Sequence, residues 1–295
     1  MTTQKFYISD CIAGCKKLVK SDSVDLVFAD PPFNIKFGGK QSRSYSYGVS
    51  KDKSIYYEDD MLKKDYVDWC STWMQEAMRI LKENRILIIM SSWNHVSAIE
   101  NEANRLGFVT LNHWIWRYEF GVFTPSKLTT SHYTFLVLLK GNEEKREWTF
   151  NPGKKGYQED VERKIKLLLD EFDPDERKKN VEKIATVIEE IIFKERATYS
   201  VDDFFDDIHR LTKQYTGIKH PCKLNENVLI KIFLTFSNEN DFIVDLFMGA
   251  GTSLVAASLT NRKFIGFEID EKYREVIKEL VGKRLALRKI SKKMM

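Results

Sequence analysis

The chain has 295 residues and a mass of 34.6 kDa, with 43% hydrophobic and 13% aromatic residues, a net charge of +4 and a pI near 8.6. This composition can fill a sizeable core and excludes wholesale disorder, and no apolar run approaches the roughly 20 residues that cross a bilayer. The weakly basic balance is compatible with a nucleic-acid partner but does not require one, because many enzymes share it.

The cysteines show neither a disulfide framework nor the paired C-x-x-C spacing of a zinc site. We therefore expect reduced thiols and no structural metal at the four positions Cys11, Cys15, Cys70 and Cys222. The segment from Met1 to Phe6 lacks the basic and then apolar pattern of a signal peptide. A soluble, cytoplasmic protein without a membrane segment is expected.

The first half of the chain alternates strand-like and helix-like patterns. Short apolar runs predict strands at Val24–Ala29, Arg85–Met90, Val109–Trp116 and Tyr133–Lys140, and helical spacing predicts a helix at Lys64–Lys82. Strands that alternate with helices are typical of a mostly parallel sheet covered on both faces.

Residues 34–60 have a different texture, with three glycines and many serines. A loop of this length without hydrophobic periodicity is usually functional or mobile. Two interpretations stay open: a solvated surface excursion, or a basic, aromatic-bearing loop that closes over a nucleic acid. In the second case the candidate DNA contacts are Lys36, Lys40, Arg43 and Lys51, together with Arg117 farther along the chain.

After the last of these strands the pattern becomes helical. Asp173 followed by Pro174 is typical of a helix N-cap and first helical position, and apolar residues at helical spacing follow within 181–191. Ser200–Asp203 has capping-box spacing and predicts a further helix from Phe204 onward.

We interpret residues 142–219 as a helical insertion between the two parts of one domain, 1–141 and 220–295. Residues 151–219 contain 14 Lys and Arg against 16 Asp and Glu, so the insertion is not a simple basic clamp. DNA contact through a few residues, and association with a partner or a second copy, both stay open.

The alternating pattern returns near the C-terminus. Strands are predicted at Phe242–Phe247 and Lys263–Phe267, with a helix at Ser253–Thr260 between them. Gly249 and Gly251 lie where the first strand gives way to the helix, so the backbone there can pass close to a ligand at a helix N-terminus.

Glu268 ends the second strand, 17 residues after Gly251, where a carboxylate can accept hydrogen bonds from the ribose hydroxyls of an adenosine cofactor. A dinucleotide-binding turn has a third glycine three residues after the second, and this chain has Leu254 there. A ligand with adenosine but no phosphate fits better, and S-adenosylmethionine is the obvious one.

Asp30-Pro31-Pro32-Phe33 directly follows an apolar strand. Two prolines remove backbone donors and fix φ, so the carbonyls in the turn are free acceptors. An amino group can donate one hydrogen to the Asp30 carboxylate and the other to the Pro31 carbonyl, while Phe33 offers a face for stacking a flipped base. The alternative is a tight proline turn that only closes the strand.

These segments together resemble the amino-methyltransferases of DNA, in the group whose catalytic motif precedes the cofactor motif (the beta class). The resemblance covers about 1–140 and 220–285. Asp30–Phe33 resembles the catalytic motif, and the other matching segments are Ser9-Asp10, Met78–Lys82, Ser131–Lys140, His220–Cys222, Asp245–Ser253 and Phe264–Asp270. Leu246 and Ser9 depart from the family pattern, which has proline and glycine there.

The resemblance implies a Rossmann-like class I methyltransferase fold, α/β, with a seven-stranded, mostly parallel sheet, helices on both faces and a helical insertion in the place of the target-recognition region. It implies catalytic roles for Asp30, Pro31, Pro32 and Phe33. The implied cofactor-binding residues are Asp10, Cys11, Asp30, His220, Pro221, Cys222, Asp245, Phe247, Gly249, Gly251, Thr252, Ser253 and Glu268.

The implied reaction is methyl transfer from S-adenosylmethionine to a flipped-out base in double-stranded DNA. Asp at position 30 resembles the adenine-N6 branch, whereas N4-cytosine enzymes more usually have Ser there. An N4-cytosine enzyme, an RNA methyltransferase and a non-catalytic DNA-binding subunit stay as alternatives. The resemblance leaves open a restriction endonuclease partner within a restriction–modification system, and a homodimer.

Overall fold

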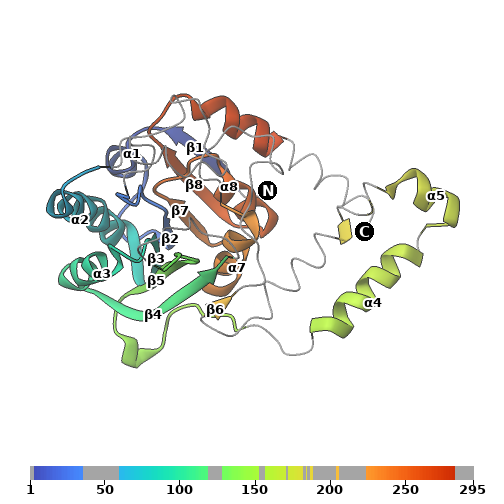
Figure 1. Ribbon diagram of the computed structural model, residues 1–295, viewed down its shortest axis with the longest axis horizontal. Coiled ribbons are helices and arrows are strands. Elements are labelled where there is room, and N and C mark those ends of the chain that lie inside the picture. The colour runs from blue at the N-terminus through green and yellow to red at the C-terminus, as the bar shows by residue number, and fades with distance from the viewer. Residues whose placement is uncertain are drawn as a thin grey trace.

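The computed structural model describes residues 3–35, 60–118, 128–152, 157–170, 172–181, 184, 187–188, 204–205 and 224–282. In this part of the chain one mixed sheet organises the molecule, with strand order β1-β8-β7-β2-β3-β5-β4-β6 (Figure 1). Its strands are β1 (Gln4–Ile8), β2 (Val24–Ala29), β3 (Leu81–Ser91), β4 (Phe108–Arg117), β5 (His132–Lys140), β6 (Phe204–Phe205), β7 (Phe242–Asp245) and β8 (Lys263–Glu268).

The sheet is mostly parallel, as expected from the sequence. Only β5 pairs antiparallel to its neighbours, β3 on one side and β4 on the other, whereas the remaining pairs run parallel. Seven strands have four or more residues, and the two-residue β6 extends the sheet beyond β4. The predicted seven-stranded core is confirmed.

Helices cover both faces of the sheet (Figure 1). On one face lie α1 (Cys11–Leu18), α2 (Lys63–Ile80) and α3 (Val96–Arg105), and on the other lie α7 (Glu226–Phe236) and α8 (Thr252–Leu259). Strand β2 shows why both faces are covered, because all six of its residues are buried and the four from Leu26 to Ala29 alternate between the two cores. A parallel strand buried on both sides reads as a continuous apolar run.

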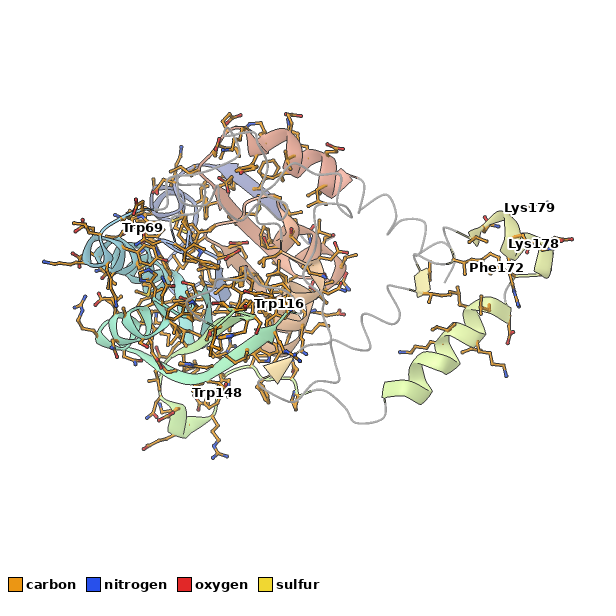
Figure 2. The ribbon with its side chains drawn as sticks, viewed as in Figure 1. Trp69, Trp116, Trp148, Phe172, Lys178 and Lys179 are labelled. Atoms are coloured by element: carbon orange, nitrogen blue, oxygen red, sulfur yellow. The ribbon has the colours of Figure 1, made fainter. Side chains whose placement is uncertain are left out.

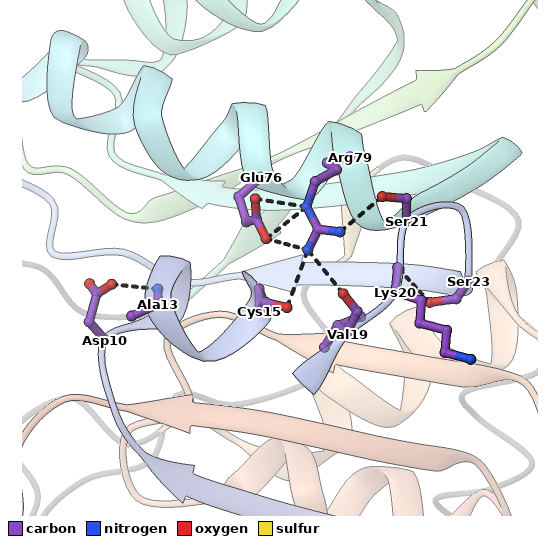
Figure 3. Close-up of polar contacts among 9 residues, drawn as sticks. All are labelled: Asp10, Ala13, Cys15, Val19, Lys20, Ser21, Ser23, Glu76 and Arg79. Atoms are coloured by element: carbon purple, nitrogen blue, oxygen red, sulfur yellow. Dashed lines mark hydrogen bonds and ion pairs between the residues drawn. The ribbon is translucent and has the colours of Figure 1, made fainter. Parts of the chain in front are cut away.

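Polar side chains fix the ends of α1 on the first of these faces (Figure 3). Asp10 caps the helix, with its Oδ1 accepting the N–H of Ala13 at 2.9 Å. At the other end Arg79 of α2 donates through Nη2 to the carbonyls of Cys15 at 3.2 Å and Val19 at 3.0 Å. Glu76, one helical turn earlier, holds the guanidinium in place.

The segment predicted as a helical insertion contains a short 3₁₀ turn at Glu143–Lys145, then α4 (Tyr157–Asp170) and α5 (Pro174–Lys179). The predicted cap of α5 is confirmed, because Asp173 Oδ1 accepts the N–H groups of Asp175 and Glu176. Figure 2 shows Phe172, Lys178 and Lys179 on this helical pair, well away from Trp69 and Trp116 of the sheet region.

The prediction of a helix from Phe204 onward is wrong for its first two residues. Phe204 and Phe205 form β6, which pairs parallel with Ile115 and Trp116 of β4. The capping-box spacing is a local signal, whereas the exposed edge of β4 offers unpaired backbone groups that two aromatic residues can join.

Candidate active site

The acidic residues singled out in the sequence converge at one edge of the sheet. Asp30 follows β2 and Asp245 ends β7, and these two strands are parallel neighbours, with Phe28 opposite Asp245. From β7 the sheet continues through β8 to β1, and from β2 it continues the other way through β3. The boundary between β2 and β7 is therefore a topological switch point. At such points open α/β sheets bind ligands, at the carboxyl ends of their strands.

The Asp30-Pro31-Pro32-Phe33 turn lies at this point. Pro31 is buried, and the other three residues are half-buried. Among the residues that the structure describes, none donates a hydrogen bond to the Asp30 carboxyl or to the Pro31 carbonyl. The turn thus presents two acceptors, one from a side chain and one from the backbone.

Two carboxyl groups at the switch point resist ionisation. Burial, reinforced by the nearby charge of Asp245, raises the pKa of Asp30 to about 8. Burial also raises the pKa of Asp245 to about 7, against the opposing effects of the Ser253 hydroxyl and the Phe247 amide. Such shifts arise where negative charge is removed from water without a nearby cation, so a positively charged ligand fits between these groups.

The glycine turn after β7 is tied to the end of β8. Glu268 accepts the N–H of Gly249 through Oε2 at 2.9 Å and the N–H of Asp270 through Oε1 at 2.8 Å. Gly249 and Gly251 have φ of +53° and +89°, and at Gly251 a Cβ atom would meet Ile277 at 3.1 Å. Each carboxylate oxygen has a second lone pair, so Glu268 can shape the turn and still accept a ligand hydroxyl.

Helix α8 starts directly after Gly251 without a side-chain cap. Its first residues, Thr252 and Ser253, are both buried. An uncapped helix N-terminus that follows a glycine turn leaves backbone N–H groups for a ligand.

An aromatic cluster flanks Phe33. Its ring lies 5.7 Å from that of Tyr133, at the start of β5. Tyr133 in turn contacts Trp116 and Tyr118, with ring centroids 5.7 and 5.0 Å away. Phe33 thus packs on one side against a cluster of rings that come from β5, from β4 and from the residue after β4.

Two residues that the sequence analysis missed contact backbone carbonyls of the turn and of the residue after it. Tyr66 of α2 donates its hydroxyl to the Pro32 carbonyl at 2.7 Å. His95, just before α3, places Nε2 3.3 Å from the Asn34 carbonyl. Neither carries a sequence signal, because Tyr66 reads as an ordinary core position of a helix and His95 as an isolated histidine.

The remaining predicted site residues divide into two groups. Asp10, Cys11 and Arg117 are described, at the carboxyl ends of β1 and β4: Asp10 and Arg117 are exposed, and burial raises the pKa of the Cys11 thiol to about 12. Outside the described residues lie Lys36, Lys40, Arg43, Lys51, His220, Pro221 and Cys222.

Within the described ranges, no helix is long and apolar enough to cross a membrane. The same ranges hold no group of three or more His, Cys, Asp or Glu side chains suited to a metal ion.

Comparison with known proteins adds independent information. The family N6_N4_Mtase, described as DNA methylase, matches residues 24–279. Type II methyltransferase M2.LlaDCHI from Lactococcus lactis subsp. cremoris is 26% identical over 266 residues, which cover 90% of this chain and 84% of that protein. Type II methyltransferase M.BamHI from Bacillus amyloliquefaciens is 28% identical over 280 residues, covering 93% of this chain and 56% of that longer protein.

Two solved structures share the fold at low sequence identity. The M1.HpyAVI–SAM complex aligns with a TM-score of 0.56 at 17% identity, covering 95% of this chain and all of that one. The cytosine-N4-specific PvuII DNA methyltransferase aligns with a TM-score of 0.59 at 15% identity, covering all of this chain and 93% of that one. Both likenesses support the class I methyltransferase fold.

Proposed function

The chain belongs to the N6/N4 DNA methylase family, and from this premise we propose that it transfers a methyl group from S-adenosylmethionine to the N6 amino group of an adenine flipped out of double-stranded DNA. The family membership makes it a DNA methyltransferase and S-adenosylmethionine its methyl donor. The choice of adenine, the site-specific action and the residue roles below belong to the proposal.

One observation carries the proposal. Asp30 and Pro31 are consecutive residues that present two acceptors, and no described residue donates to either. A primary amine on a purine or pyrimidine ring has two hydrogens to donate, so it matches this pair of acceptors. A turn that only closed a strand would not require a half-buried carboxyl group with its pKa raised to about 8.

The two acceptors also prepare the amine for reaction. Donation to the Asp30 carboxylate and to the Pro31 carbonyl directs the two N–H bonds and turns the nitrogen lone pair away from ring conjugation. Bound S-adenosylmethionine supplies an electrophilic methyl group on a positively charged sulfur. The Asp30 carboxylate stabilises the positive charge that develops on the nitrogen and orients the N–H that is later released as a proton.

The described residues suit that cofactor. The buried carboxyl groups of Asp30 and Asp245 lie at the switch point where a cation is favoured. Glu268 and the turn around Gly249 provide a carboxylate and an open backbone for the adenosine part. The predicted cofactor contacts of Asp10, Cys11, Thr252, Ser253 and the 220–222 segment remain part of this proposal.

The proposal extends to DNA contacts. Phe33 stacks on the flipped base, whose extrusion from the duplex costs a few kcal/mol. Arg117 is exposed at the carboxyl end of β4, the same edge of the sheet as the switch point, and Lys36, Lys40, Arg43 and Lys51 are further candidates for phosphate contacts. Residues 142–219 are proposed to select the target sequence.

Adenine is favoured over cytosine because Asp30 resembles the adenine-N6 branch. The order of the motifs, with Asp30–Phe33 before 245–253, favours the beta class. Relatives that are Type II methyltransferases support a role in a restriction–modification system; an accompanying endonuclease and a homodimer both stay open.

The test is to incubate the purified protein with unmethylated genomic DNA and labelled S-adenosylmethionine, digest the DNA to nucleosides and identify the modified base by mass. N6-methyladenine is the expected product. N4-methylcytosine would overturn the base assignment while retaining the mechanism. Transfer only to RNA, or no transfer at all, would overturn the DNA substrate or the catalytic role.

The variant Asp30→Ala tests whether the turn carries the catalytic chemistry. It should abolish methyl transfer with a much smaller loss of cofactor affinity, measured by calorimetry, from the missing negative charge. Near-normal turnover in this variant would refute the role given to Asp30.

A further inference from the structure

The hydroxyl of Tyr66 makes a direct contact with the catalytic turn. Tyr66 lies near the start of α2 with only 2% of its surface exposed, and its Oη donates to the Pro32 carbonyl at 2.7 Å. This carbonyl belongs to the peptide that joins Pro32 to Phe33. The bond therefore fixes the plane of that peptide, one residue after the Pro31 carbonyl that is proposed to receive the amine.

His95 contacts the backbone that follows Phe33. Its Nε2 lies 3.3 Å from the carbonyl of Asn34, which is the first carbonyl after that of Phe33 itself. A carbonyl only accepts, so in this hydrogen bond Nε2 carries a proton and donates it. The side chain is 6% exposed, and Nδ1 is buried without a partner among the described residues.

The two side chains support each other. The rings of Tyr66 and His95 pack with centroids 4.9 Å apart at 54°, and the Tyr66 ring also packs on Trp69, which contacts Phe247 of the glycine turn. The pair thus lies between the catalytic turn and the backbone proposed to hold the cofactor.

A buried polar atom left unpaired at Nδ1 is unfavourable, and a buried tyrosine could pack equally well without its hydroxyl. Both polar atoms that do have partners contact backbone carbonyls that flank Phe33, those of Pro32 and Asn34. This common target is not explained by core packing alone, which would be satisfied by apolar side chains of the same size.

We infer that Tyr66 and His95 are positioning residues that clamp the Pro32–Phe33 peptide and the Asn34–Ile35 peptide, one before and one after Phe33, so that the Pro31 carbonyl and the Phe33 ring are held in the geometry that methyl transfer requires. The inference rests on the proposed function and adds to it two residues that do not touch substrate or cofactor. Catalytic rates depend steeply on such alignment, because a shift of about 1 Å can cost about a hundredfold.

Tyr66→Phe tests the first half of the clamp. It keeps the ring packing on His95 and Trp69 and removes only the hydroxyl. We expect kcat to fall by about ten- to a hundredfold, with the KM for DNA and the Kd for S-adenosylmethionine changed by less than about threefold.

Two controls separate this effect from general damage. Tyr273→Phe makes the same chemical change at another buried tyrosine, for which no hydrogen bond to the turn is seen in the described part of the chain, and should keep wild-type kcat. Cys70→Ala removes a thiol that also interacts with Tyr66 but leaves the bond to Pro32, and should likewise keep wild-type kcat.

His95 is tested by a pair of variants. His95→Gln can place an amide donor near the position of Nε2, whereas His95→Leu fills the space without a donor. Positioning through the hydrogen bond predicts that His95→Gln recovers most of the kcat that His95→Leu loses. Equal losses in the two variants would overturn the role of the hydrogen bond.

Hydrogen exchange gives a readout that does not depend on turnover. The amides of Phe33, Asn34 and Ile35 should exchange faster in Tyr66→Phe and in His95→Leu than in the wild type, while those of β8 stay unchanged. Unchanged exchange at the turn, or wild-type kcat in Tyr66→Phe, would overturn the inference. Faster exchange at the turn in a protein that methylates no DNA would support the clamp and overturn the proposed function instead.

Discussion

Asp30 and Asp245 carry the unusual chemistry of this protein at the scale of single residues. Each is an ordinary aspartate whose surroundings, above all burial, raise its pKa to about 8 and about 7. In the ligand-free protein at neutral pH, Asp30 is largely protonated. A positively charged cofactor would lower these pKa values and return Asp30 to the carboxylate form that accepts the amine.

This coupling predicts different pH profiles for the free and the cofactor-bound enzyme. The value of kcat/KM for S-adenosylmethionine, which reports the free enzyme, should rise with pH through about 8 and level off above it. The value of kcat should level off at lower pH, because the bound sulfonium lowers the pKa of Asp30. Steady-state rates between pH 5.5 and 9 check this, and an unchanged rising limb in residual Asp30→Asn activity would contradict it.

Asp245 predicts a second pH effect, on stability. The pKa of Asp245 in the folded protein, about 7, lies above its usual value of 3.8. Between these two pH values the folded protein still binds a proton that the unfolded chain has released. The stabilisation is complete below the unfolded pKa and is lost as the pH rises through about 7.

Asp245→Asn removes this titration and retains an oxygen to accept the Phe247 N–H. The free energy of unfolding should therefore fall less between pH 5 and pH 8 in the variant than in the wild type. Urea denaturation at the two pH values measures the difference, and equal changes in both proteins would assign the loss to other groups.

At the scale of elements, α2 connects parts of the molecule that are distant in sequence. Its N-terminal half contacts the catalytic turn through Tyr66, and its aromatic residues Trp69 and Trp73 pack against Phe247 of the glycine turn. Its C-terminal half holds the end of α1 through Arg79. Displacement of this one helix would disturb both motifs of the site.

Arg79→Lys should destabilise the fold by about 2 kcal/mol. Lysine cannot reproduce the fork that bridges Glu76, the Ser21 hydroxyl and the carbonyls at the end of α1, and it would leave Glu76, with 6% of its side chain exposed, poorly paired. Chemical denaturation checks the prediction.

Arg105→Lys is the matched control, because Arg105 pairs with Glu102 at the same i, i+3 spacing but is 64% exposed. It should leave stability nearly unchanged, since exposed ion pairs contribute little. Equal destabilisation in both variants would mean that the carbonyl contacts of Arg79 do not matter.

At the scale of the whole molecule, the strand order creates the site. Asp30 and Asp245 are 215 residues apart in the chain, and they meet because β2 pairs with β7. The helical pair α4 and α5 lies apart from this edge (Figure 1).

Exchange of residues 142–219 for the corresponding segment of a relative should therefore change which DNA sequence is methylated and preserve the methylated base. Sequencing of the modified sites, after incubation with the chimera, gives the answer. An unchanged site in an active chimera would assign the segment to assembly rather than to target selection.

The sequence by itself determined the local chemistry and the class of the fold. Three features can be recognised from neighbouring residues. A buried strand is an apolar run, the two prolines after Asp30 fix φ, and the glycines at 249 and 251 allow positive φ, all of which are local properties. Those signals predicted the mostly parallel sheet, the coverage of both its faces and the cap at Asp173, all of which the structure has.

Only the tertiary structure decided which of these local features meet. Tyr66 contacts the catalytic turn, and His95 contacts the residue after it, through bonds that span 34 and 61 residues, and no spacing rule links such positions. Phe204 joins the sheet as a strand although its local signal favours a helix, because the edge of β4 supplies backbone partners from far along the chain. Pairing between distant segments depends on the packed whole, which a reading of neighbouring residues does not contain.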